Sequence, residues 1–88
     1  MQQSDTLLEF PCDFAIKVLG RAEQTFGGLV VAIVRRHCAD LREGAIRSKA
    51  SRGGKYISIT VTIQAESRAQ LDRLYTELST HEQILMVL

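Results

Sequence analysis

The sequence predicts a single α+β domain with a ferredoxin-like arrangement, and three observations lead to this prediction. Residues 55–65 (KYISITVTIQA) alternate apolar and polar side chains without a break, as a strand with one buried face does. Two segments, 23–38 and 67–80, repeat apolar residues at the three- and four-residue spacing of an amphipathic helix. Three shorter strand-like segments complete the pattern: one before the first helix, one before residues 55–65 and one at the end of the chain. The element order is therefore β-α-β-β-α-β.

The strand at 55–65 is expected to lie inside a four-stranded antiparallel sheet. Right-handed crossovers place the strands in the order 4-1-3-2, with this third strand central and paired on both sides. Its apolar face consists of Ile57, Ile59, Val61 and Ile63. Its polar face consists of Tyr56, Ser58, Thr60, Thr62 and Gln64. Because only one face is apolar, both helices are expected on that face, which leaves the polar face open.

The first and second strands of the predicted order have weaker patterns. The segment Asp13–Gly20 (DFAIKVLG) alternates apolar residues with others and ends at a glycine, which indicates the first strand. The segment 45–52 (AIRSKASR) alternates weakly and is positively charged, as an exposed edge strand often is. Gly53-Gly54 then predicts a tight hairpin turn into the strand at 55–65.

The first helix is predicted at Glu23–Cys38, with Gly27 and Gly28 in its first turns. Each glycine in a helix costs about 0.5–1 kcal/mol relative to alanine, so this pair either delays the helix start or permits a close backbone approach. His37 lies on the apolar stripe near the helix end. We expect a partly buried histidine bonded to a carbonyl there, rather than a ligand or a catalytic base.

The second helix and the last strand follow. Ser67 and Gln70 form a capping-box pattern, and the helix is expected to end near Ser79 or Thr80. The last six residues, QILMVL, predict a final edge strand. Strict alternation puts Ile84, Met86 and Leu88 on one face and Leu85 and Val87 on the other. Because this edge is unusually apolar, we expect the N-terminal segment or a second subunit to cover it.

The composition indicates a small cytoplasmic domain. The chain has 88 residues, with eleven basic and ten acidic side chains and a net charge of +1, so it has no global bias toward nucleic acid or anionic membranes. The longest apolar run, 29–34, is far shorter than the roughly 20 residues that cross a bilayer, and no secretory signal is recognised. Cys12 and Cys38 lack a CxxC partner and are expected to be reduced apolar side chains.

Residues 1–12 are expected to form an N-terminal segment that packs on the domain formed by residues 13–88. The polar start of the chain is expected to fray, and Ser4 or Asp5 offers a cap for one short helical turn. Apolar side chains then follow at Leu7, Leu8 and Phe10, ahead of Pro11. These side chains give the segment an apolar side for that packing.

The sequence predicts no enzyme, because it contains no set of residues that supplies a nucleophile, a base or a metal site. His37 and His81 are far apart, and Cys12, Cys38 and Asp40 match no ligand or triad spacing. We therefore expect no catalytic residue, no cofactor and no metal.

RNA binding is the alternative prediction, because RNA-recognition domains share this element order. Those domains stack bases on aromatic side chains of the two central strands, whereas the polar face here offers Tyr56 followed by hydroxyl groups. The segment 35–55 is basic, and its candidate phosphate contacts are Arg47, Lys49, Arg52 and Lys55. A solvated edge strand explains these charges more simply, so nucleic acid is not the expected partner.

Several segments resemble the YbeD-like family of small bacterial cytosolic proteins. They are LLEFP (7–11), KVLG (17–20), Arg36-His37, YISITVTIQA (56–65), LYTEL (74–78) and the ending ILMVL. The resemblance covers nearly the whole chain and implies no established biochemical activity. The family is similar in fold to ACT domains, which are small ferredoxin-like modules that bind amino acids and regulate enzymes, usually as dimers. Some members carry a label as lipoate-related regulators.

Typical ACT domains bind their ligand at the turn between the first strand and the first helix, which carries a proline-glycine pair before leucines. The nearest equivalent here is FGGLV (26–30), which lacks the proline and the acidic residue before it. The resemblance implies a regulatory or adaptor domain that binds a protein partner or a small metabolite and can form a homodimer through a sheet edge. The residues expected to bind are Tyr56, Ser58, Thr60 and Thr62 on the polar face, and Gly20 and Gly28 at the turn.

Overall fold

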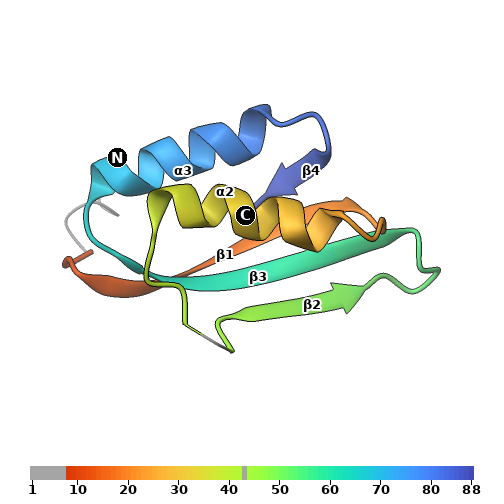
Figure 1. Cartoon of the computed structure of the whole chain (residues 1–88), viewed down its shortest axis with the longest axis horizontal. Helices are drawn as coiled ribbons and strands as arrows, with labels where there is room; N and C mark the ends of the chain where they lie inside the picture. The colour runs from red at the N-terminus through yellow and green to blue at the C-terminus, as the bar shows by residue number, and fades with distance from the viewer. Residues whose placement is uncertain (1–7, 43) are drawn as a thin grey trace.

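The chain forms one antiparallel sheet with two helices on one side of it (Figure 1). The computed structural model describes residues 8–42 and 44–88. Within them lie β1 (Cys12–Arg21), α2 (Phe26–His37), β2 (Ile46–Ala50), β3 (Tyr56–Ala65), α3 (Arg68–Thr80) and β4 (Ile84–Val87). This arrangement confirms the predicted ferredoxin-like fold. The N-terminal turn predicted around Ser4 and Asp5, and the contribution of Leu7 to it, lie outside the described residues.

The strand order is β2-β3-β1-β4, which is the predicted order read from the other edge. β1 and β3 form the centre and pair along their whole lengths, from Cys12 opposite Ala65 to Arg21 opposite Tyr56. Each has 10 residues, which corresponds to a length of roughly 33 Å. The edge strands β2 and β4 have 5 and 4 residues. Short edges of this kind limit unwanted pairing with other strands.

The core lies between the two helices and the face of the sheet that carries the isoleucines. Its largest fully buried side chains are Ile16, Ile33, Leu74, Leu78, Val18, Val30, Val34 and Val61. They come from both central strands and from both helices. Complete burial of one such side chain is worth about 1.5–3 kcal/mol, so this layer supplies most of the folding energy. The prediction that both helices cover the isoleucine face is confirmed.

Gly20 permits the closest contact between β1 and α2. A Cβ atom at this position would lie 2.2 Å from Cε1 of Phe26, which is far inside van der Waals distance. The Phe26 ring is 2% exposed and fills the space that a side chain at position 20 would need. Gly20 is therefore required for packing, because only a residue without a Cβ lets the first residue of α2 lie against the strand.

The helix α2 begins at Phe26, three residues after the predicted start, and both of the following glycines belong to its first turn. A Cβ atom at Gly27 would make an ordinary 3.7 Å contact with Ile59, and one at Gly28 would meet nothing within 4 Å. Neither glycine is explained by a close approach. The anchoring of Phe26 on Gly20 gives a physical reason for the later start.

The N-terminus of α3 is capped nearly as predicted. The Ser67 hydroxyl accepts a hydrogen bond of 3.1 Å from the Gln70 amide. The Gln70 side-chain oxygen accepts a bond of 2.7 Å from the Glu66 amide, one residue before the position that a capping box uses. The helix ends at Thr80, as predicted.

The alternation predicted for the last strand is wrong, because β4 contains a bulge. Val87 lies opposite Val18 and Met86 lies opposite Leu19, but the next residue of β1, Gly20, lies opposite Ile84. The extra residue, Leu85, shifts the register. Ile84 and Val87 therefore pack toward the helices, whereas the exposed fractions of Leu85, Met86 and Leu88 are 51%, 50% and 61%.

The chain end is fixed on β1 beyond β4. The backbone of Leu88 donates to the Lys17 carbonyl at 2.8 Å and accepts from the Lys17 amide at 3.2 Å. The Tyr75 hydroxyl donates to the Leu88 carbonyl at 3.3 Å, and the rings of Tyr75 and Phe14 form a T-shaped pair with a centroid distance of 6.4 Å. The last residue thus takes a defined place in the sheet.

The hairpin between β2 and β3 is confirmed, but its loop comprises residues 51–55 and not the glycine pair alone. The Ser51 amide donates to the Tyr56 carbonyl at 2.8 Å, and the Gly54 amide donates to the Ser51 carbonyl at 2.9 Å. Gly54 has a φ of 76°, a conformation that side-chain-bearing residues rarely adopt.

Candidate functional site

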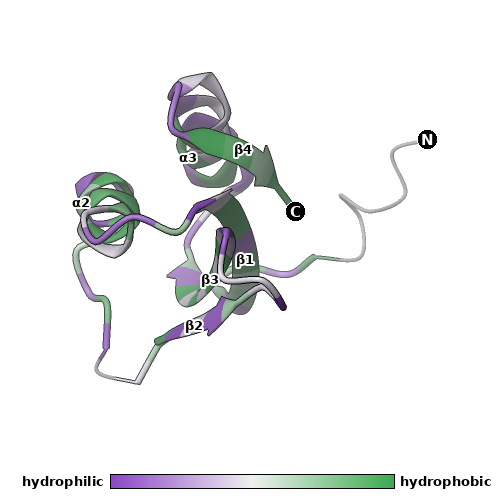
Figure 2. Cartoon of the chain, turned by 90° about the vertical axis from the view of Figure 1, so that its right-hand side faces the viewer, coloured by the Kyte–Doolittle hydropathy of each residue, from purple (hydrophilic) through white to green (hydrophobic). Residues whose placement is uncertain are grey.

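The candidate site is the open face, the side of the sheet opposite to α2 and α3. Both helices lie on the same side of the sheet, and no described helix or strand covers the other side (Figure 2). Residues that pair directly in an antiparallel sheet share a face, so the register defines the members of the open face. They are Asp13, Ala15, Lys17, Leu19 and Arg21 of β1, Tyr56, Ser58, Thr60, Thr62 and Gln64 of β3, Arg47 and Lys49 of β2, and Met86 and Leu88 at the chain end.

Three cations surround two hydroxyl groups at the middle of this face. In one row across the sheet, Thr60 lies between Arg47 and Lys17. In the next row, Ser58 lies beside Lys49. Neighbouring strands are about 4.8 Å apart, so the Cα atoms of Arg47 and Lys17 are separated by roughly 10 Å across the first row. We call Lys17, Arg47 and Lys49 the basic cluster.

The basic cluster is positively charged, and no acidic side chain of the described residues pairs with it. Its three side chains are exposed, and none of the ion pairs formed between described residues involves them. Among the described members of the face the acidic residue is Asp13, which lies four positions from Lys17, or about 13 Å along a strand. This distance exceeds the screening length of about 8 Å at physiological salt. An anionic group would therefore be attracted to the middle of the open face.

An apolar strip lies beside the basic cluster. It consists of Leu19, which is half-buried, and of Met86 and Leu88, which are exposed. Met86 lies opposite Leu19, and Leu88 exchanges two backbone hydrogen bonds with Lys17. The open face thus combines cations over β2 and β1 with apolar side chains over β1 and the chain end.

The structure brings together part of the predicted site. Ser58 and Thr60 lie at the middle of the face, half-buried, while Thr62 is exposed further along β3. Tyr56 is 39% exposed at the start of β3, opposite Arg21. These four residues share one face, as predicted, and their role in binding stays a prediction.

The predicted nucleic-acid contacts divide between the face and the loop beside it. Arg47 and Lys49 lie on the open face, whereas Arg52 and Lys55 lie in the loop between β2 and β3. An open hollow of about 550 Å³ runs from Lys17 past Ser58 to Arg52. Arg52 therefore borders the face without belonging to a strand.

Sequence reasoning missed Lys17, Leu19 and Met86 as members of the site. The alternation of β1 placed Lys17 and Leu19 on the polar side of their own strand, which was the available signal. What the alternation could not give was the register that sets Lys17 beside Thr60. The bulge that turns Met86 toward Leu19 left no signal in a run of apolar residues.

The predicted turn site is less favourable for a ligand. At Gly20 the Phe26 ring occupies the space beside the backbone, and Gly28 is exposed on α2. A hollow of about 270 Å³ lies next to this turn and is lined by Arg21, Glu23, Phe26, Glu82, Gln83 and Leu85. The binding roles of Gly20 and Gly28 stay a prediction.

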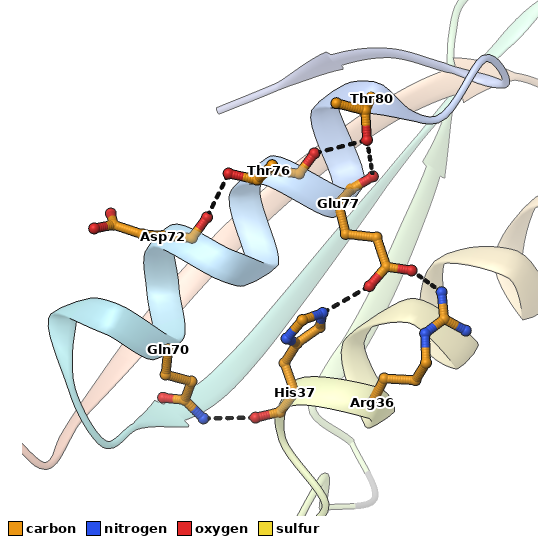
Figure 3. Close-up of polar contacts among 7 residues, drawn as sticks. All are labelled: Arg36, His37, Gln70, Asp72, Thr76, Glu77 and Thr80. Carbon is orange, nitrogen blue, oxygen red and sulfur yellow. Dashed lines mark hydrogen bonds and ion pairs between the residues drawn. The ribbon is translucent and has the colours of Figure 1, made fainter.

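A polar cluster joins the two helices on the covered side of the sheet (Figure 3). Nε2 of His37 lies 2.7 Å from Oε1 of Glu77, and the Arg36 guanidinium donates to the other oxygen of the same carboxylate. The Gln70 side-chain amide donates to the His37 carbonyl at 2.8 Å. Because a carboxylate contacts the ring, the prediction that the His37 side chain bonds to a carbonyl is wrong.

This polar cluster fits a structural role. Burial of the ring, followed by the positive charges of Arg36 and Arg73, lowers the pKa of His37 below 6.5. Glu77 acts in the opposite direction, and the net effect on the pKa is a decrease. The neighbouring Cys38 is 8% exposed and belongs to the core, so it offers no accessible nucleophile. The cluster holds the end of α2 against α3.

The described part of the chain contains neither a metal-binding cluster nor a membrane-spanning helix. Among residues 8–42 and 44–88, no group of three or more His, Cys, Asp or Glu side chains is placed to hold a metal ion. Within the same residues no helix is long and apolar enough to cross a membrane.

The strand order and the two helices on one face define a small domain with a ferredoxin-like fold. The chain belongs to the family described as "Protein of unknown function (DUF493)", whose model matches residues 5–88. Curated relatives are UPF0250 proteins, so the resemblance to the YbeD-like family is confirmed. One from Nitrosomonas europaea is 43% identical over 84 residues, which is 96% of this chain and 97% of the relative. One from Janthinobacterium sp. is 41% identical over 88 residues, which is 100% of this chain and 97% of the relative.

Solved structures share the fold at low sequence identity. Protein HP0495 from H. pylori aligns with a TM-score of 0.70 and 12% identity, over 92% of this chain and 85% of that one. The ACT domain from the GTP pyrophosphokinase of Chlorobium tepidum aligns with a TM-score of 0.65 and 15% identity, over 86% and 84%. The C-terminal domain of the MgtC protein from Mycobacterium tuberculosis aligns with a TM-score of 0.69 and 22% identity, over 92% of this chain and 88% of that one. These likenesses show the fold alone.

Proposed function

We propose that this protein is a non-enzymatic regulatory or adaptor domain of the bacterial cytoplasm that binds a protein partner or a small metabolite on its open face. The observation that carries the proposal is the middle of that face, where Ser58 and Thr60 stand among Lys17, Arg47 and Lys49. Hydroxyl and ammonium or guanidinium groups are donors for carboxylates and other polar groups of a ligand. The long central strands hold these donors on a rigid base.

The likeness to ACT domains supports a regulatory role, because such modules bind amino acids and regulate enzymes. The proposed binding surface differs from theirs. Phe26 fills the space at Gly20, and the turn lacks the proline of typical ACT domains. We therefore rank the open face above the turn as the candidate binding surface. The lipoate-related label of some family members makes lipoate one metabolite to test, beside the amino acids.

A site-specific photocrosslinker tests this proposal directly. A photoreactive residue at Thr60, on the open face, should give adducts in living bacteria, whereas the same residue at Ala32, exposed on α2, should not. Equal adducts at both positions would show that contact is random. For metabolites, the melting temperature of the purified chain is measured with each amino acid and with lipoate. A rise that is lost in the Thr60→Val variant indicates a ligand on this face.

RNA binding is the second candidate, because the basic cluster lies on a free sheet face. The arrangement favours it less than protein or metabolite binding. Tyr56 is the one aromatic member of the described face, whereas RNA-recognition sheets stack two or three bases on several aromatic residues. Fluorescence anisotropy with oligoribonucleotides at low salt tests this candidate, and an absence of binding there would remove it.

A further inference from the structure

We propose that the open face binds an acidic amphipathic helix of a partner protein. This inference rests on the proposed function and names the partner's chemistry. Glutamate or aspartate side chains of the partner would meet the basic cluster, and its apolar side chains would cover the apolar strip of Leu19, Met86 and Leu88. Two independent features of one surface thus select one kind of ligand.

The charge of the face favours an acidic partner. Lys17, Arg47 and Lys49 are exposed and form no ion pair with another described residue. Asp13, the acidic member among the described residues of the face, is roughly 13 Å along the strand from Lys17. Complementary charges of this kind speed encounter and exclude basic partners.

The dimensions of the face fit one helix. From the chain end beside β1 to the side chains of β2, the face spans three interstrand spacings, or about 14 Å, and a helix with its side chains is about 10–12 Å wide. A helix lying along β1 and β3 therefore touches the apolar strip with one side and the basic cluster with the other. The roughly 33 Å length of these strands accommodates about 20 helical residues.

The apolar strip favours a protein over a nucleic acid. Met86 and Leu88 are 50% and 61% exposed, and they lie beside the cations. Phosphate groups satisfy the cations but leave these side chains in water, and a single exposed tyrosine offers little base stacking. A helix with leucines beside glutamates satisfies both halves of the surface.

The test uses a defined probe, because the natural partner is unidentified. The probe is a peptide of about 18 residues that places leucines on one side of a helix and glutamates on the other. It is titrated into the full-length, isotope-labelled chain, and backbone amide shifts are recorded by NMR. Shifts are expected in β1, β2 and β3 along the open face, with affinity that falls as salt is raised. A control peptide with lysine in place of every glutamate is expected to cause no shifts of these amides.

Matched variants separate the two halves of the surface. Arg47→Glu, on the open face, is expected to weaken peptide binding about three- to tenfold, whereas Arg35→Glu, at an exposed position on α2, should change it less than about twofold. Met86→Thr is expected to weaken binding by a similar factor. Ile46→Thr, which removes an exposed apolar side chain from the helix side of β2, should not. Circular dichroism of each variant confirms that the fold is kept.

Several outcomes overturn the inference. Oligoribonucleotides that shift the open-face amides while the glutamate peptide does not would replace it with RNA binding. Equal losses in Arg47→Glu and Arg35→Glu would reduce the contact to general charge attraction. Loss of self-association in Arg47→Glu, measured by sedimentation, would make a second copy of the chain the occupant. Crosslinks at Thr60 without peptide binding would overturn this inference alone. Failure of the crosslinking, the peptide titration and the thermal test with metabolites together would overturn the proposed function as well.

Discussion

The covered face and the open face of the sheet are built from alternate residues of the same strands, yet they differ in almost every physical respect. Ile16 and Val18 of β1 are fully buried, while Lys17 between them is exposed. In β3, Val61 is fully buried and its neighbour Thr60 lies among cations. The two-residue period of a strand lets one segment supply the core and the candidate site together.

This comparison shows how a domain of 88 residues accommodates both tasks. At the middle of the central strands, Lys17 is flanked by buried Ile16 and Val18, and Thr60 by buried Ile59 and Val61, so the core fixes their backbone positions. The open-face side chains themselves contribute little to that core. Substitutions on the open face are therefore expected to change binding and leave the fold intact, and substitutions one residue away in the middle of β1 and β3 are expected to do the opposite.

The largest effect is expected when adjacent residues on the two faces are exchanged for alanine. Ile16→Ala should lower the free energy of unfolding by about 2–5 kcal/mol, because it leaves a cavity in the core. Lys17→Ala should change it by no more than about 0.5 kcal/mol. Urea denaturation followed by circular dichroism measures both. Similar losses in the two variants would show that the open face is packed by something and is not free.

The second largest effect on stability is expected when Gly20, on the covered face, and Gly28, on the exposed side of α2, are each replaced by alanine. Gly20→Ala should destabilise the fold by about 1–3 kcal/mol, because the new Cβ would overlap the Phe26 ring. Gly28→Ala, where the space is empty, should stabilise α2 by up to about 1 kcal/mol. The same denaturation measurement decides the signs. A neutral Gly20→Ala would mean that Phe26 moves away easily and that the turn can open for a ligand.

Much of the fold was predictable because β3 and the two helices have unmixed periodicities. Ile59, Val61 and Ile63 could only form one face, and right-handed crossovers then left one strand order. The bulge in β4 was not predictable, since every residue of Ile84–Val87 is apolar and no polar side chain marks a face. The start of α2 was misjudged because it depends on the contact between Gly20 and Phe26, which joins two elements.

The candidate site was predictable only where it lies within one strand. Ser58 and Thr60 followed from the alternation of β3, and Arg47 and Lys49 followed from the charge of β2. Their meeting with Lys17 depends on pairing between strands that are distant in sequence. The same limit applies to His37, because its contact with Glu77 links residues 40 positions apart. Local patterns carry no information about such partners.

The third prediction concerns pH and the covered side of the sheet. The pKa of His37 is lower in the folded chain than its ordinary value of 6.5, so the unfolded chain binds the proton more tightly. The contribution of His37 to stability is therefore complete above pH 6.5. It should fall as pH decreases from there toward the lowered folded pKa, and it should stay constant below that.

The measurement is the urea midpoint at a series of pH values around 6.5, compared with that of His37→Gln. The variant should lose this part of the pH dependence, and His81→Gln, which changes a half-buried histidine at the end of α3, should keep it. Stability that rises as pH falls through this range would mean that Glu77 dominates the environment of His37, because an opposite charge favours the protonated ring.

The smallest effect on stability is expected at the edge that borders the open face. We expect a homodimer to form by pairing β4 with a second copy, because Leu85 is 51% exposed on a strand with a free edge among the described residues. Leu85→Lys should shift the sedimentation mass toward a monomer and change the unfolding free energy by less than about 0.5 kcal/mol. Ile46→Lys, at the opposite edge β2, is the matched control and should leave the mass unchanged. A mass that responds to Ile46→Lys alone would move the interface to β2, beside the basic cluster, and the partner helix and the second copy would then compete for Arg47 and Lys49.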